Sequence, residues 1–168
     1  MVDATESWLL AQARQTGRVL QAAGIAWLED PIHHLDVAGL AELRRQLEVP
    51  IAAGEHLYHL EAFRALLEAR AVDVLILDLA RVGGVTPWRK IAALAHAHRI
   101  PVCGHVVPEI QVHVLAAVPN GHLVEYVPRS AGILAEMPRP EAGELVATSG
   151  PGLGLQLDEA AVRLYQTD

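Results

Sequence analysis

The sequence predicts an α/β fold, specifically a partial (β/α) TIM-type barrel of about six βα units. Short apolar runs that each end in an acidic residue or a histidine alternate with longer segments in which apolar residues recur at helical spacing. This alternation is typical of a parallel sheet. The polar residues that end the runs follow one another at intervals of 26, 26, 23, 27 and 20 residues. These intervals are close to the roughly 25 to 30 residues that one βα unit of a barrel requires.

Strands and helices are expected in regular alternation along the chain. The strand-like runs cover residues 1–3, 25–29, 51–55, 72–78, 101–105 and 123–126. The helical segments cover residues 7–23, 37–46, 60–69, 87–98, 108–117 and 158–165. Thr86 followed by Pro87 indicates the N-cap and first turn of the fourth helix, and Gly24 stands where a helix C-terminal glycine is expected. Asp73 is expected in the loop that enters the fourth strand.

The C-terminal part of the sequence has a different pattern. From Pro128 onward, prolines and glycines punctuate the chain and the alternation of strands and helices is lost. We interpret residues 128–168 as a segment that wraps around the preceding units, so that residues 1–168 form a single domain.

The composition excludes several classes of protein. Apolar residues make up 52% of the 168 residues, enough for one sizeable core, and the formal net charge of −7 argues against a nucleic-acid partner. The single cysteine, Cys103, excludes an internal disulfide and fits a reducing compartment. No apolar run is long enough to span a bilayer, and residue 1 is not followed by a signal-peptide pattern. We therefore expect a cytoplasmic protein without a membrane partner.

Three of the residues that end strands suggest a metal site. Asp3, Glu29 and Glu55 would converge at the carboxyl ends of neighbouring strands, where barrel active sites are built. Carboxylate oxygens are the ligands that Mg²⁺ prefers, and an open coordination sphere leaves room for substrate. The alternative is that each acid caps a helix or faces solvent, which is the usual fate of a single surface acid. Three acids at one height weaken that alternative.

The next strand ends suggest acid/base chemistry. Asp78 and His105 end adjacent strands, so the carboxylate would hold the tautomer of the imidazole and raise its basicity. Glu125, after the last strand, would donate a hydrogen bond to a developing oxyanion if kept protonated in a partly apolar site. The alternatives are a satisfied core or surface histidine and, for Glu125, a surface acid beside Tyr126.

The other histidines do not form a zinc motif. His105, Glu109 and His113 are spaced by four residues, but Pro108 starts the helix after His105, so the two histidines cannot share a helix face. The sequence contains no HExxH, GxSxG, P-loop or GxGxxG motif. Their absence argues against a zincin, a serine hydrolase of the GxSxG type and a nucleotide-binding protein. Four side chains follow the ligand-bearing strands and are expected near substrate: His33, His34, His56 and Tyr58.

Taken together, these motifs resemble a known family. The segments that carry the resemblance are VDATESW, WLEDPI, PIAAGEHLY, LDLARVGGVTPWRKIAALA, CGHVVPEIQVHVLAA and HLVEY. They are similar to the C-terminal barrel domain of the enolase superfamily, in particular its mandelate racemase group, and would correspond to strands 3 to 8 of that barrel. The resemblance implies Mg²⁺ ligands at Asp3, Glu29 and Glu55, an acid/base dyad of Asp78 and His105, and an oxyanion-stabilising or acidic role for Glu125.

The resemblance also implies a reaction. Members of the family abstract the proton α to a carboxylate and form an enediolate held by Mg²⁺. The muconate-lactonizing and dipeptide-epimerase branch carries a lysine where this chain has Asp78, which disfavours that branch. We expect an acid-sugar (aldonate- or aldarate-type) dehydratase, because that activity is widespread in the group. The alternative is a racemase or epimerase like mandelate racemase.

The sequence departs from the family in two respects. The N-terminal capping domain and the first two barrel strands, the second with a Lys-x-Lys pair, have no counterpart here, and the only lysine is Lys90 within a predicted helix. Three interpretations remain open: a truncated form or segment of a longer enzyme, one part of a split enzyme that another chain completes, or a non-catalytic remnant that binds a divalent ion or partner. We expect a homo-oligomer, because exposed sheet edges favour association and members of the family that the chain resembles are commonly symmetric oligomers.

Overall fold

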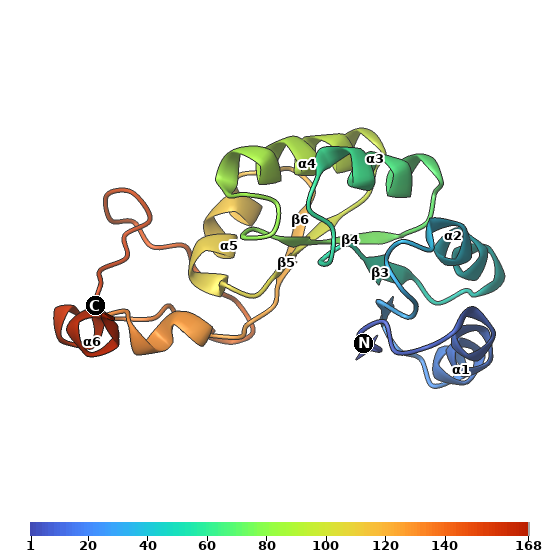
Figure 1. Cartoon of the computed structure of the whole chain (residues 1–168), viewed down its shortest axis with the longest axis horizontal. Coiled ribbons are helices and arrows are strands. Elements are labelled where there is room, and N and C mark those ends of the chain that lie inside the picture. The colour runs from blue at the N-terminus through green and yellow to red at the C-terminus, as the bar shows by residue number, and fades with distance from the viewer. Residues whose placement is uncertain (168) are drawn as a thin grey trace.

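The computed structural model of the chain describes residues 1–167 and contains one six-stranded sheet. All neighbouring strands are parallel and lie in sequence order, as expected. The strands are β1 (Val2–Asp3), β2 (Leu28–Glu29), β3 (Ile51–Ala53), β4 (Val74–Asp78), β5 (Val102–His105) and β6 (Gly121–Val124). The helices are α1 (Leu10–Ala22), α2 (Val37–Gln46), α3 (Leu60–Glu68), α4 (Val85–Ala97), α5 (Pro108–Ala116) and α6 (Glu159–Tyr165). The α/β prediction is confirmed (Figure 1).

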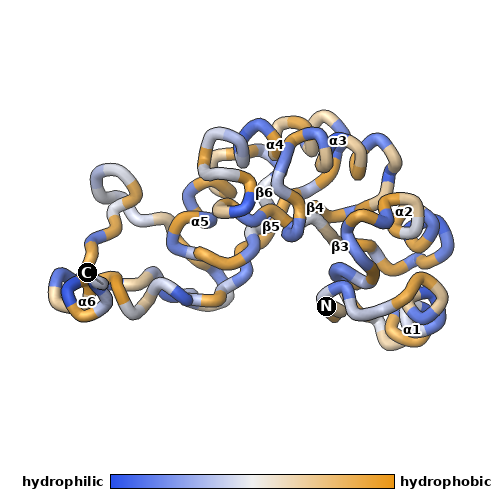
Figure 2. The backbone as a smooth tube through the Cα atoms, in the orientation of Figure 1, coloured by the Kyte–Doolittle hydropathy of each residue, from blue (hydrophilic) through white to orange (hydrophobic). Residues whose placement is uncertain are grey.

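The core has two parts, one on each face of the sheet. Strand side chains alternate between faces, so Leu75 and Leu77 join the large cluster formed with the helices. Trp27, Ile76 and Cys103 belong to a second, smaller cluster. Burial on both faces explains why β4 reads as a continuous apolar run. The helices differ from β4 in this respect. Figure 2 shows apolar and polar residues interspersed along α1 and α2, as expected for helices with one face toward a core.

Two strands have different ends from those predicted. β3 ends at Ala53, two residues before Glu55, because Gly54 adopts φ +134° and turns the chain out of the strand. A Cβ atom at Gly54 would lie 2.7 Å from the carbonyl oxygen of Ile76, so this turn also requires a residue without a side chain. β6 ends at Val124, so Glu125 follows the strand as Glu55 does.

Helix boundaries follow the prediction closely except at two N-termini. The expected range of α2 is confirmed, and Gly24, at φ +73°, directly follows the C-cap of α1 as predicted. α1 begins at Leu10, not at residue 7. The predicted N-cap at Thr86 is wrong, since α4 begins at Val85 with Gly84 as N-cap. Pro87 is tolerated because the first turn of a helix needs no backbone N–H donors.

The C-terminal segment leaves the sheet after β6. It contains a short 3-10 helix (Arg129–Gly132) and α6, neither of which buries a residue. The two halves of the segment meet through an antiparallel bridge between Leu134 and Leu157, and the Tyr126 hydroxyl donates a hydrogen bond to the Pro138 carbonyl oxygen. Figure 1 shows this segment extending away from the helices that cover the sheet. Within residues 1–167, no helix is both long and apolar enough to cross a membrane.

Candidate active site

Strand periodicity gathers several polar side chains at one end of the sheet. Asp78 follows Ile76 by two residues and His105 follows Cys103 by two, so both point toward the face of the smaller core cluster. Glu29 stands in the same relation to Trp27, and Asp3 pairs with Glu29 in the register of β1 and β2. The site therefore lies where β1, β2, β4 and β5 end, on the face opposite the helices.

Asp78 and His105 are in direct contact. They are register partners on β4 and β5, and Nδ1 of His105 lies 2.7 Å from Oδ2 of Asp78. The other Asp78 oxygen accepts the backbone N–H of Arg81 at 2.8 Å, and Gln111 donates to the His105 carbonyl oxygen at 3.1 Å. With Nδ1 engaged, Nε2 of His105 faces the acids, 3.4 Å from Glu55 Oε1 and 3.9 Å from Glu125 Oε2. This arrangement suits an imidazole that exchanges a proton at Nε2.

The acids around His105 repel one another. Burial raises the pKa of Glu29, and the charges of Asp3 and Glu125 raise it further, against a 2.7 Å hydrogen bond from Trp27 Nε1 that lowers it. Burial likewise raises the pKa of Glu55; His105 and Arg81 oppose the shift, whereas Glu29 and Asp3 add to it. A cation would relieve this repulsion.

The predicted trio of Asp3, Glu29 and Glu55 is less compact than the strand-end argument implies. Among the described residues, the groups whose ligand atoms all lie within 4.8 Å of one another are Asp30–Glu55–His56 and Glu6–His33–His34. Asp3 is exposed and accepts the backbone N–H of Thr5 at 2.8 Å, while Glu29 is held by Trp27. Among the described residues, Asp3, Glu29 and Glu55 therefore do not form a group in which one ligand atom from each lies within 4.8 Å of the others.

Asp30 lies among the candidate site residues, and sequence reasoning missed it. It is 1% exposed, neither carboxylate oxygen has a hydrogen-bond partner, and Oδ2 lies 3.6 Å from Nε2 of His56. Burial, followed by the charges of Glu55 and Glu29, raises the pKa of Asp30 to about 8. The signal was the second acid of the Glu29–Asp30–Pro31 sequence, which ends a buried strand.

Arg81 was missed as well. It lies between β4 and α4, and its Nη1 donates to the Glu55 carbonyl oxygen at 2.8 Å and lies 3.7 Å from Glu55 Oε1. Gly83 and Gly84, both at positive φ, turn the chain behind it into α4. A cation three residues after a strand-ending acid and followed by two glycines was the available signal.

The remaining predicted residues lie at the rim. Glu125 has 43% of its side chain exposed and accepts the backbone N–H of Val106 at 2.9 Å. His56 is partly buried, with Nε2 3.5 Å from Glu55 Oε1, whereas His33 and Tyr58 are exposed. A cavity of about 140 Å³ opens beside Glu29 and Glu125. The roles of all these residues stay predictions.

A parallel sheet with alternating helices and with polar groups gathered at the carboxyl ends of its strands defines the α/β class of fold, in which binding sites are built at that end of the sheet. The chain belongs to the enolase C-terminal domain-like family, whose model matches residues 1–161. It is 32% identical to L-talarate/galactarate dehydratase of Salmonella typhimurium over 99% of this chain and 42% of that protein. It is 34% identical to D-xylonate dehydratase of Haloferax volcanii, again over 99% of this chain and 42% of the relative.

Solved structures of enolase-family proteins also match nearly the whole chain. An enolase from Bradyrhizobium, crystallised with magnesium and mandelic acid, matches with a TM-score of 0.93 and 36% identity over 99% of this chain and 46% of that one. L-talarate dehydratase from Polaromonas, crystallised with Mg and L-glucarate, matches with a TM-score of 0.92 and 34% identity over 97% and 46%. The chain thus spans less than half the length of these relatives.

Proposed function

We propose that this chain is the barrel part of a Mg²⁺-dependent acid-sugar dehydratase that removes the proton α to a carboxylate. The observation that carries the proposal is the orientation of His105, whose Nδ1 is held by Asp78 while Nε2 faces a group of acids. The substrate class is taken from relatives named as talarate, galactarate and xylonate dehydratases.

The residues present fit a divalent cation. Burial and mutual repulsion raise the pKa of both Glu29 and Glu55, so positive charge at this place would be stabilising. Asp3, Glu29 and Glu55 would hold Mg²⁺, consistent with the all-oxygen ligand sets this ion prefers. When bound, Mg²⁺ supplies charge stabilisation for the substrate carboxylate as the α-proton leaves.

The chain's own residues would perform the proton transfers. His105 takes the α-proton at Nε2, while Asp78 keeps Nδ1 protonated and stabilises the imidazolium. The electrons of the broken C–H bond form a carbon–carbon double bond as the bond to the β-hydroxyl breaks. The proton on Nε2 passes to that hydroxyl, which leaves as water. Arg81 would hold Asp78 and Glu55 in position, because its backbone N–H donates to Asp78 and its guanidinium donates to the Glu55 carbonyl oxygen.

A racemase is the second candidate. The similar Bradyrhizobium structure contains mandelic acid, which has no β-hydroxyl to eliminate. Racemisation also begins with abstraction of the α-proton, and it requires a second acid on the opposite face of the substrate to return a proton. Both reactions therefore share the step assigned to His105.

Deuterium exchange tests this shared step. The purified 168-residue chain would be incubated in D₂O with talarate, galactarate, xylonate and mandelate, with Mg²⁺ or with EDTA. We expect deuterium at the α-carbon of at least one substrate, dependent on Mg²⁺. Loss of water would identify a dehydratase, and inversion without loss of water would identify a racemase. A folded, Mg²⁺-binding chain that exchanges none of them would show that the proposed activity requires the rest of a longer protein.

A further inference from the structure

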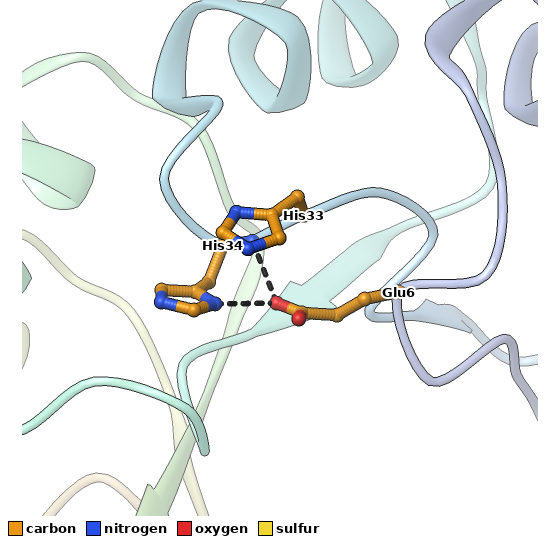
Figure 3. A group of neighbouring side chains, drawn as sticks. All are labelled: Glu6, His33 and His34. Atoms are coloured by element: carbon orange, nitrogen blue, oxygen red, sulfur yellow. Dashed lines mark hydrogen bonds and ion pairs between the residues drawn. The ribbon is translucent and has the colours of Figure 1, made fainter.

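A second cluster of ligating side chains lies outside the proposed reaction site. Glu6 comes from the loop between β1 and α1, and His33 and His34 come from the loop between β2 and α2. The three residues each offer a ligand atom, and these atoms all lie within 4.8 Å of one another. Figure 3 shows the Glu6 carboxylate extending from one loop toward the two imidazoles of the other.

Glu6 already positions half of this cluster. Its Oε1 accepts the backbone N–H of His34 at 2.6 Å and lies 2.7 Å from Nδ1 of the same residue (Figure 3). The two side chains are only 16% and 24% exposed. Although burial opposes it, hydrogen bonding with His34 lowers the pKa of Glu6, so the carboxylate is charged at neutral pH. The Glu6 carboxylate and the His34 imidazole are therefore already in contact before any metal ion binds.

The second imidazole is adjacent and lightly engaged. The His33 ring stacks on the His34 ring with centroids 4.4 Å apart and planes 23° from parallel. Nδ1 of this ring accepts a hydrogen bond of 3.2 Å from the backbone N–H of Leu35. Because Nδ1 accepts this hydrogen bond with its lone pair, the same lone pair could bind a metal ion once the bond is given up at this exposed side chain.

Two imidazoles and one carboxylate are the ligands of a transition-metal ion. Imidazole nitrogen suits Zn²⁺, Co²⁺, Ni²⁺ and Cu²⁺, whereas Mg²⁺ and Ca²⁺ prefer oxygen ligands alone. Three protein ligands leave a position for water or another small ligand. The strand-end acids offer the opposite chemistry, so the two sites would select different ions.

We propose that Glu6, His33 and His34 form a binding site for a divalent transition-metal ion, of which Zn²⁺ is the best match, separate from the strand-end site. Binding would release the proton shared by Glu6 Oε1 and His34 Nδ1 to solvent, and these two atoms, 2.7 Å apart, would separate to admit the ion. The His34 ring stacks on His56 with centroids 5.6 Å apart, and His56 contacts Glu55, so the site adjoins the proposed reaction centre.

Calorimetric titration tests this site with Zn²⁺ itself. Saturating Mg²⁺ is present throughout to occupy the strand-end acids, and Co²⁺ serves as a second probe whose visible absorption reports imidazole coordination. We expect one ion per chain, and Glu6→Gln or His34→Gln should weaken binding by about tenfold or more. His33→Gln changes an exposed side chain and should give a similar loss, with thermal unfolding measured alongside to show that the fold is kept.

Two control variants make the result decisive. His96→Gln removes an exposed histidine on α4 and should leave Zn²⁺ affinity unchanged, as should Asp3→Asn at the strand ends. Equal losses in His96→Gln and His34→Gln would mean non-specific binding to histidines and would overturn the proposal. Binding that is lost in Asp3→Asn but kept in Glu6→Gln would place the ion at the strand ends and would also overturn it. Absence of Zn²⁺ binding by the folded chain is a third contradictory result.

Discussion

The middle of the sheet and its first edge hold their functional residues very differently. β4 and β5 pair over four positions, and the last pair is Asp78 with His105. β1 and β2 pair over two positions, and Asp3 at their end is exposed and bonded to a neighbouring amide. The strands in the middle thus fix two side chains in contact, whereas those at the edge bring carboxylates near one another without fixing them.

This difference separates two kinds of functional group. An acid/base pair needs one defined hydrogen bond, which paired central strands supply directly. A set of metal ligands needs several oxygens around a point, and the ion itself supplies much of the energy that gathers them. We therefore expect changes at the dyad to abolish chemistry and changes at the acids to act first on metal affinity.

The largest effect is expected at the dyad. In the form of the protein that catalyses α-proton exchange, His105→Ala should lower the exchange rate by about 10² to 10⁴, because the base itself is lost. Asp78→Asn should have a comparable effect, since the amide no longer holds the imidazole tautomer. Exchange measured by NMR in D₂O reports the loss, and calorimetry should find Mg²⁺ affinity unchanged. Retained exchange in either variant would contradict the dyad.

Metal affinity should respond next. Glu55→Ala removes a buried carboxylate among the acids and should weaken Mg²⁺ binding by about ten- to a hundredfold, as for other changes at a metal site. The matched control is Glu61→Ala, an exposed acid in the first turn of α3. Calorimetry at equal ionic strength separates the two variants. Equal affinities in Glu55→Ala and the control would remove Glu55 from the ligand set.

The fold could be predicted from the sequence because it depends on local patterns of apolar residues. Apolar runs on a period of two and helical segments between them depend on burial alone, and the spacing of about one βα unit fixed their order. Element ends were harder to predict, because they depend on backbone geometry. Gly54 ends β3 early, and Gly84 starts α4 before Thr86. The sequence alone does not distinguish these two glycines from the other glycines of the chain.

The site was readable only in part. Asp78 and His105 follow from strand register, which a regular interval predicts. Asp30 and Arg81 come from loops beyond the strand ends, where periodicity carries no information about side-chain direction. Asp30 was hidden because an acid beside another acid reads as solvent-exposed, whereas its backbone at φ 36° turns it into the protein.

Stability should distinguish the glycine that leads to Glu55 from one in open space. Gly54→Ala places Cβ 2.7 Å from a backbone oxygen at φ +134°, and should destabilise the fold by about 1 to 3 kcal/mol. Gly24→Ala is the control, because its φ of +73° carries backbone strain but no atom lies within 4 Å of the added Cβ. Urea unfolding should show the larger loss in Gly54→Ala. Equal losses would mean that strain alone, and not the contact with β4, requires glycine at residue 54.

The smallest effect is expected at the other edge of the sheet. Glu125→Gln removes a charge 3.9 Å from His105 Nε2, but the amide oxygen can still accept the backbone N–H of Val106. With 43% of the side chain exposed, water screens much of that charge, so turnover should fall by about tenfold or less. Thermal unfolding should be unchanged, which separates this loss from a structural one. Wild-type turnover would make Glu125 a surface acid, whereas a loss as large as that of His105→Ala would show that this exposed edge contributes as much as the central strands.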